Sequence, residues 1–266
     1  MKNNKALGQH WLKNRAILEE IAELTAGRGY EAPEESAEQV SEKTEVDGCE
    51  LCVEIGPGLG FLTSSLFRRF KRIIAVEFDG ELARKLPGSF PGKDLEVVNE
   101  DILKFDFSKI KGEYVVAGNI PYYITSPIIE KVLTVENLPK RVVLLMQKEV
   151  AERIISEKET GLSLFVKNRA KVWAGPVVLK GEFTPPPKVD SQVIIMEPHA
   201  PEVNEEVFEL IRKSFSSPRK KLVHNLAGLK SRDELIKILE KIGVDVDARP
   251  GDLHLNDYQN LFGALS

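Results

Sequence analysis

The segment best suited to chemistry is Asn119-Ile-Pro-Tyr122, which follows a short apolar run at residues 114–117. The β-branched residues of that run are typical of a buried strand, and the glycine after it places the tetrapeptide on a loop at the strand's carboxyl end. Pro121 lacks an N–H and fixes its φ angle, so its carbonyl is predicted to be a free acceptor on a stiff backbone. Asn119 adds a second acceptor, and Tyr122 adds a flat ring. This set suits an exocyclic amine on a planar base, although the same residue types are common in turns.

A glycine-rich segment upstream indicates a ligand site. Gly56-Pro-Gly-Leu-Gly60 lies between an apolar strand pattern at residues 51–55 and a helical pattern at residues 61–67. Glycines let the backbone turn tightly and approach a ligand closely, and a helix N-terminus offers free N–H groups. A dinucleotide fingerprint would read G-x-G-x-x-G, and here the third glycine comes one position early. A tight strand–helix connection without a ligand therefore stays open.

Two acidic residues follow the next two predicted strands. Glu77 ends the strand at residues 73–76, 21 positions after Gly56, and Asp101 follows the strand at residues 95–98. An acid at the offset of Glu77 can accept both hydroxyls of a ribose, and Asp101 could reach the adenine of the same nucleoside. A single acid of this kind is usually a cap or a surface residue. Here, however, three loops each follow the carboxyl end of a predicted strand. Open α/β sheets bind ligands at that edge.

These segments together resemble a known enzyme family. The run from Glu54 to Gly60, with Glu77, Asp101 and the Asn119 tetrapeptide, resembles the S-adenosylmethionine site and catalytic loop of Rossmann-like methyltransferases. Leu7-Gly-Gln-His-Trp-Leu12 and Phe183-Thr-Pro-Pro-Pro-Lys-Val-Asp-Ser191 are similar to the small-subunit ribosomal RNA adenine dimethyltransferases, the KsgA family. The likeness covers nearly the whole chain, and residues 31–50 are the main departure.

The resemblance implies a cofactor, S-adenosyl-L-methionine, and a set of site residues. The residues expected to contact the cofactor are His10, Leu12, Gly56, Gly58, Glu77, Asp101 and Asn119. Asn119 and Pro121 would accept hydrogen bonds from the target amine. Tyr122 and, on the other side, Phe183 would stack on a base taken out of its helix. For Phe183 the alternative is a side chain packed in the core beside a stiff proline-rich connection.

The chain as a whole is expected to have two parts. We predict an α/β fold over residues 1–200, with a Rossmann-like methyltransferase sheet and helices on both faces. A boundary is predicted at Glu197-Pro-His-Ala-Pro201, followed over residues 201–266 by a small helical domain that contacts RNA. This tail is too short to have much of a core of its own. Its basic group Arg219-Lys220-Lys221 resembles the family's C-terminal signature.

Composition limits the setting of the protein. The 266 residues are 42% hydrophobic and 29% charged, as in an ordinary globular protein, and no apolar run has membrane-spanning length. The two cysteines, Cys49 and Cys52, form a lone C-x-x-C, which is weak support for metal or redox chemistry, so no metal is expected. We expect a monomeric cytoplasmic protein that does not bind a membrane.

The distribution of charge is compatible with an RNA partner despite a net charge of −4. Residues 31–50 hold eight acids and one lysine, a local −7 that leaves +3 for the rest. Such a segment is predicted to be a solvated, mobile insertion. Basic clusters at residues 68–72 and 219–221 could face phosphates, although charge clusters are more often solvated surface.

The expected partners are small-subunit rRNA and the immature small ribosomal subunit. The expected reaction forms N6,N6-dimethyladenosine at two adjacent adenosines near the 3′ end of that rRNA. Three alternatives stay open: a large-subunit rRNA methylase of the erythromycin-resistance type, a DNA adenine methylase, and a mainly non-catalytic ribosome assembly factor. The proline-rich loop and the basic C-terminal segment favour the small-subunit assignment over the first.

Overall fold

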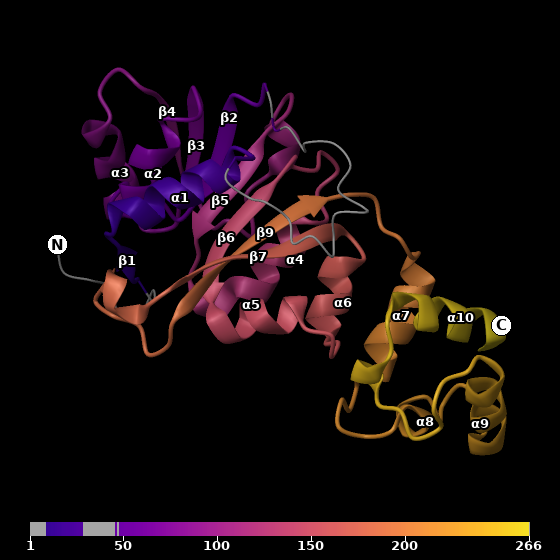
Figure 1. The fold of residues 1–266 in the computed structure, drawn as a ribbon. Coiled ribbons are helices and arrows are strands. Elements are labelled where there is room, and N and C mark those ends of the chain that lie inside the picture. The colour runs from indigo at the N-terminus through magenta and orange to yellow at the C-terminus, as the bar shows by residue number, and fades with distance from the viewer. Residues whose placement is uncertain (1–8, 29–45, 47, 266) are drawn as a thin grey trace. The chain divides into compact units, whose positions relative to one another are not determined.

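The structure, a computed structural model, describes residues 9–28, 46 and 48–265 (Figure 1). The predicted acidic insertion at residues 31–50 lies mostly outside the described residues, as do Leu7 and Gly8. The chain divides into two compact units. The first runs to Ala151 and includes Lys171–Pro198, and the second consists of Glu152–Ala170 and the chain from His199 onward. The sequence-based division at residue 200 had assigned Glu152–Ala170 to the first part instead.

The first unit is built on a seven-stranded sheet. Its strands are β2 (Leu51–Ile55), β3 (Arg72–Glu77), β4 (Asp94–Asn99), β5 (Val115–Asn119), β6 (Val142–Gln147), β7 (Ala170–Val178) and β9 (Ser191–Pro198). Their order in space is β4-β3-β2-β5-β6-β9-β7. The pairs from β4 to β6 are parallel, and β9 runs antiparallel to β6. The carboxyl ends of β2, β3, β4 and β5 therefore meet at one edge.

Both faces of this sheet are covered. Cys52 and Val53 are consecutive residues of β2 that point to opposite faces, and both are fully buried. One face packs on α1 (Arg15–Thr25) and α2 (Phe61–Leu66), which contribute to one hydrophobic cluster. Further helices are α3 (Gly80–Lys85), α4 (Thr125–Val132) and α5 (Lys148–Ile155), which contains the boundary between the units. The predicted α/β fold class is confirmed.

The start of the described chain is attached to the proline-rich loop. Strand β1 (Trp11–Leu12) pairs antiparallel with β8 (Phe183–Thr184) in a separate two-stranded sheet, with Leu12 opposite Phe183. Asn14 caps α1, because its side chain accepts from the backbone N of Ala16 at 3.0 Å. The same side chain donates from Nδ2 to the Glu182 carboxylate at 2.8 Å. The N-terminal segment and the loop thus form one substructure.

The second unit is helical. It contains α6 (Gly161–Lys167), α7 (Glu205–Ser214), α8 (Leu222–Asn225), α9 (Arg232–Lys241) and α10 (Leu255–Leu265) (Figure 1). Arg169 packs its guanidinium over the rings of Phe165 and Phe208, at 4.5 and 5.3 Å from their centroids. No described helix of the chain is long and apolar enough to cross a membrane.

Candidate functional site

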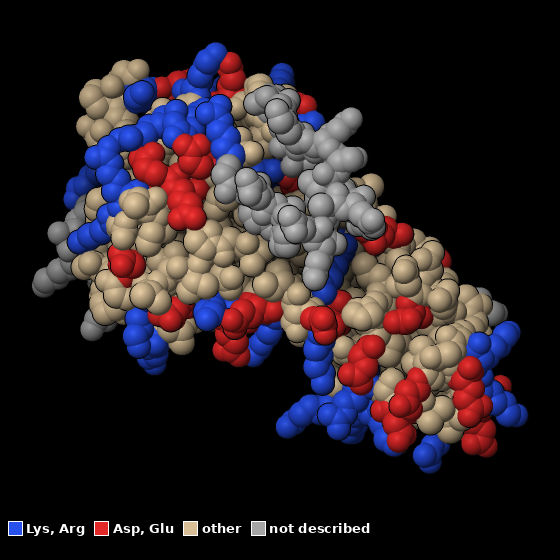
Figure 2. All heavy atoms as spheres, viewed as in Figure 1, with Lys and Arg blue, Asp and Glu red and all other residues tan. Residues whose placement is uncertain are grey.

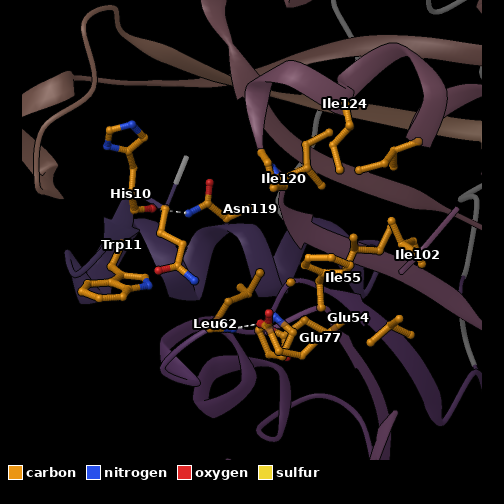
Figure 3. Close-up of a pocket in the computed structure, with 18 of the residues that line it drawn as sticks. His10, Trp11, Glu54, Ile55, Leu62, Glu77, Ile102, Asn119, Ile120 and Ile124 are labelled. Carbon is orange, nitrogen blue, oxygen red and sulfur yellow. Dashed lines mark hydrogen bonds between the residues drawn. The ribbon is translucent and has the colours of Figure 1, made fainter. Parts of the chain in front are cut away.

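A pocket of about 220 Å³ lies in the first unit, at the carboxyl edge of the sheet (Figure 3). All seven residues predicted to contact a cofactor line it: His10, Leu12, Gly56, Gly58, Glu77, Asp101 and Asn119. They come from β1, from the glycine-rich turn and from the ends of β3, β4 and β5. The parallel topology explains the grouping of the residues that end or follow β2, β3, β4 and β5, because each of these four strands delivers its following loop to the same edge.

Glu77 holds the glycine-rich turn in place. One carboxylate oxygen accepts from the backbone N of Gly58 at 2.9 Å, and the other accepts from the backbone N of Asp79 at 2.8 Å. Gly58 has φ +58°, and a Cβ added there would lie 3.3 Å from Nε1 of Trp11, so a side chain would be both strained and crowded. Burial raises the pKa of Glu77, while these backbone N–H groups oppose the shift. Each oxygen keeps a lone pair for a ligand.

Glu54 lies beside Glu77 beneath the pocket and is only 1% exposed (Figure 3). Burial raises the pKa of Glu54 to about 8, and the nearby Glu77 carboxylate acts in the same direction. Its Oε2 has no hydrogen-bond partner among the described residues. At neutral pH Glu54 is therefore mostly the neutral acid, whereas two backbone N–H donors favour the charged form of Glu77.

Asn119, the last residue of β5, is oriented by the N-terminal segment. Its Nδ2 donates to the backbone carbonyl of His10 at 3.0 Å (Figure 3). Because the amide nitrogen faces a carbonyl, Oδ1 is the atom left to accept. The Pro121 carbonyl, predicted to be a free acceptor, instead accepts from the backbone N of Ile124 at 3.2 Å, since the chain turns into a 3-10 segment (Tyr122–Ile124) there. Only its second lone pair remains.

Tyr122 is contacted at its hydroxyl and on one face of its ring. Its hydroxyl shares a 2.7 Å hydrogen bond with Oγ of Ser191, and its ring lies nearly parallel to that of His10, with centroids 5.9 Å apart and an interplanar angle of 19°. Nδ1 of His10 is in turn 2.8 Å from the backbone carbonyl of Pro185. Burial raises the pKa of the Tyr122 hydroxyl, so it stays protonated. The proline-rich loop thus contacts the segment that contains Asn119 and Tyr122 as well as the N-terminal segment.

The chain also matches a known protein family over its whole length. Residues 1–266 match the family described as ribosomal RNA adenine dimethylase. The chain belongs to this family. The resemblance inferred from the sequence motifs is therefore confirmed.

Individual relatives agree with the family assignment. Proteins named ribosomal RNA small subunit methyltransferase A are 33% identical in Geobacillus thermodenitrificans, over 98% of this chain and 90% of that protein, and 36% identical in Crocosphaera subtropica, over 96% and 95%. Among solved structures, a dimethyladenosine transferase from Plasmodium falciparum is 28% identical with a TM-score of 0.75, covering 95% of this chain and 96% of that one. The 23S rRNA methyltransferase ErmE, at 23% identity, TM-score 0.73 and coverage of 96% and 99%, shows the shared fold.

Phe183 does not lie where the family resemblance had placed it. It is 3% exposed, belongs to the hydrophobic cluster beneath α1, and is not among the residues that line the pocket. Its pairing opposite Leu12 in the β1–β8 ladder directs the side chain into that cluster. In this conformation Phe183 cannot stack on a base in the pocket, and the core-packing alternative describes it correctly.

The three basic residues predicted to contact RNA lie together in the second unit. Arg219, Lys220 and Lys221 line a shallow surface pocket with His224, Asp247 and Arg249. Figure 2 shows Lys and Arg side chains gathered around the loop ahead of α8. Lys221 forms an ion pair with Asp247, so part of its charge is compensated. Arg249, 28 residues beyond Lys221, adds a cation that the sequence cluster did not include.

Sequence reasoning missed several apolar residues of the first-unit pocket. Phe78 and Ile102 line it, and each directly follows a predicted acid, Glu77 and Asp101. Phe61 and Tyr123 line it as well. The position of Phe78 and Ile102 was a usable signal, because the residue after a strand-end acid lies on the same loop.

Proposed function

We propose that the chain transfers methyl groups from S-adenosyl-L-methionine to N6 of two adjacent adenosines near the 3′ end of small-subunit rRNA. The proposed product is N6,N6-dimethyladenosine, formed during ribosome biogenesis. The observation that carries the proposal is the Asn119 amide, held by the His10 carbonyl with its oxygen left as an acceptor, at the pocket that Glu77 and Asp101 line. The names of the curated relatives support the choice of the small subunit.

The residues of the pocket fit the proposed cofactor. Glu77 has a lone pair on each carboxylate oxygen beyond its two backbone hydrogen bonds, which suits the two hydroxyls of a ribose. Phe78 and Ile102 offer apolar surface for the faces of a purine, and Asp101 lies beside them for its polar edge. S-adenosylmethionine, when bound, supplies a methyl group that its sulfonium has already activated. The chain therefore needs no metal to activate the methyl donor.

The task left to the protein is to position the amine. The lone pair of adenine N6 is delocalised into the ring, so the nitrogen is a poor nucleophile unless its surroundings favour a pyramidal geometry. Oδ1 of Asn119 and the remaining lone pair of the Pro121 carbonyl would accept from the two N6 hydrogens and favour that geometry. Holding reacting groups in alignment supplies much of the rate in such a site.

Tyr122 is proposed as the stacking surface for the target base. A base in the pocket must first leave its helix, and stacking on an aromatic ring offsets part of that cost by about 1–3 kcal/mol. The Ser191 hydrogen bond and the His10 ring fix Tyr122 before the base arrives. The stacking surface is therefore present before the RNA binds.

RNA binding is proposed to involve the second unit too. Arg219, Lys220 and Arg249 are cations on one shallow surface, suited to the phosphates of small-subunit rRNA. The proposed partner is the immature small ribosomal subunit, and the proposed acting form is a cytoplasmic monomer.

One comparison tests this function against its alternatives. The protein and radiolabelled S-adenosylmethionine are incubated in three separate reactions, with immature small subunits, with large subunits and with duplex DNA. We expect incorporation into small subunits alone. Incorporation into large subunits or DNA would overturn the substrate assignment, and tight small-subunit binding without incorporation would favour an assembly factor.

A further inference from the structure

Two adjacent tyrosines at the pocket have opposite surroundings. Tyr122 is held by Ser191 and by the ring of His10. Tyr123 is 65% exposed, and among the described residues its side chain makes no hydrogen bond or ring contact. Because Tyr123 also lines the pocket, its exposed ring lies at the pocket's rim. Burial in the core therefore does not explain the aromatic residue at this position.

The backbone that carries Tyr123 is fixed. The backbone N of Ile124 donates to the Pro121 carbonyl at 3.2 Å, and Oγ1 of Thr125 donates to the Tyr122 carbonyl at 3.1 Å. Helix α4 follows directly and is anchored by buried residues, including Ile128. A tyrosine ring moves about only two side-chain bonds, so ordering it against a ligand costs little entropy. The exposed ring is a ready contact surface.

The position of Tyr123 indicates what it would contact. Phe61 and Phe78, the other exposed aromatic residues at this pocket, belong to α2 and to the loop after β3, on the cofactor side. Tyr123 instead belongs to the catalytic loop, where the target base would enter. A nucleotide in the pocket stays joined to its neighbours through its phosphates, so the adjoining nucleotide must lie at the pocket mouth. Exposed aromatic rings stack on single-stranded bases of any sequence.

We propose that Tyr123 is the stacking surface for the nucleobase adjoining the target adenosine. This inference rests on the proposed function and adds a second RNA contact to it. Because the proposed targets are two adjacent adenosines, Tyr123 would hold one of them at the pocket mouth while Tyr122 holds the other inside. Tyr123 thereby favours substrates whose neighbouring nucleotide is also free of its helix.

The test uses a fluorescent base in place of one of the two adenosines. Small subunits are reconstituted with rRNA that carries 2-aminopurine there; this base has no N6 amine, and stacking on an aromatic ring quenches its fluorescence. Tyr123→Ala and Tyr123→Phe are compared with wild type. Leu179→Ala is the matched control, since Leu179 is 61% exposed in the same unit and does not line the pocket. Steady-state methylation of unlabelled small subunits and S-adenosylmethionine affinity are measured for the same proteins.

The stacking model predicts a specific pattern. The complex with Tyr123→Ala should be brighter than the wild-type complex, and its KM for small subunits should rise by about 5- to 150-fold, the range expected when one stacking interaction is removed. Tyr123→Phe and Leu179→Ala should match wild type, and every variant should keep its cofactor affinity. A raised KM without a change in fluorescence would mean that Tyr123 contacts something other than the base, and the proposal would be wrong.

The outcome also separates this inference from the function on which it rests. If wild type methylates small subunits and Tyr123→Ala matches it in both fluorescence and KM, only the role of Tyr123 is refuted. If wild type methylates no small subunits, the proposed function fails and the role of Tyr123 fails with it.

Discussion

Asn119 and His10 are 109 positions apart, yet Nδ2 of Asn119 donates to the backbone carbonyl of His10 at 3.0 Å. This hydrogen bond assigns the two ends of the amide, because a carbonyl can only accept. It therefore gives the N-terminal segment a role in the proposed catalysis, since that segment leaves the Asn119 oxygen as the atom that would accept from the target amine.

The first prediction concerns this amide. Asn119→Ala should cut single-turnover methylation severely while RNA affinity barely changes, because much of that affinity comes from the phosphates. Asn119→Asp keeps an acceptor but places a second acceptor against the His10 carbonyl, so it should also be impaired. Asn137→Ala, which removes a side-chain amide remote from the pocket, is the control. An Asn119→Asp variant with full activity would show that the His10 contact has no positioning role.

The second prediction concerns the cofactor. Glu77→Ala should weaken S-adenosylmethionine binding by about 1.5–3 kcal/mol, the usual contribution of hydrogen bonds to a charged group. Calorimetry measures the dissociation constant, and thermal unfolding checks that the glycine-rich turn tolerates removal of the hydrogen bond to Gly58. Glu81→Ala, an exposed glutamate on the nearby α3, should leave affinity unchanged. An unaltered dissociation constant for a folded Glu77→Ala would refute the ribose assignment.

The third prediction follows from the raised pKa of Glu54. The pKa of Glu54 is 4.5 in an unfolded chain and about 8 in the folded protein. Between these two pH values, Glu54 keeps a proton in the folded protein that it has released in the unfolded chain. The stability contributed by the neutral acid is complete below about pH 4.5 and declines as the pH rises toward 8. Glu54→Gln stays neutral at every pH, so its stability should fall less than that of wild type between about pH 5.5 and 8.5.

Denaturant unfolding at several pH values measures this difference. Glu20→Gln, at an exposed position of α1, should follow the wild-type pH dependence. If Glu54→Gln lost stability with pH as steeply as wild type, Glu54 would be ionised in the folded protein, and its assignment as the neutral member of the pair would be incorrect.

The fourth prediction concerns the basic surface of the second unit. Replacing both Arg219 and Lys220 by Ala should lower the slope of log affinity against log salt, by roughly one unit for each phosphate that the variant no longer binds. Lys221→Ala should have a smaller effect, because Asp247 already pairs with that ammonium. A double Ala variant of Lys237 and Lys241, exposed on α9, is the control. Equal slopes for all variants would mean that the cluster is only solvated surface.

The fifth prediction separates the ring of Tyr122 from its hydroxyl. Tyr122→Ala should slow methylation, whereas Tyr122→Phe should be mild, because stacking needs the ring. Ser191→Ala removes the other half of the 2.7 Å hydrogen bond and should resemble Tyr122→Phe. If Tyr122→Phe were as slow as Tyr122→Ala in single-turnover assays, the hydroxyl would carry the function instead of the ring.

The meeting of Glu77, Asp101 and Asn119 at one pocket was predictable from sequence for a topological reason. Glu77, Asp101 and Asn119 each end or follow a parallel strand, and parallel strands bring such residues to one edge whatever the rest of the fold does. The pattern of a strand lies within a few consecutive residues, so it can be recognised without knowing which strands pair with it. The resemblance to the family added His10 and Leu12, which strand patterns alone would not have placed at the pocket.

The other features depended on pairings between residues far apart in the chain. The burial of Phe183 follows from a two-residue ladder with Leu12, which is too short to leave a periodic pattern. The Asp247 partner of Lys221 lies 26 positions away. Segment 152–170 reads as part of the first unit because it follows one of its strands, yet it packs with later helices. Such pairings become visible only in three dimensions.

The central claim is that this chain dimethylates adenosine in small-subunit rRNA. The most direct measurement is mass spectrometry of nucleosides from small-subunit rRNA of cells that contain the wild-type protein, no protein, or Asn119→Ala. We predict N6,N6-dimethyladenosine at two adjacent positions near the 3′ end with wild type, and its absence in the other two. The same amount of dimethyladenosine at these positions in cells without the protein would contradict the claim.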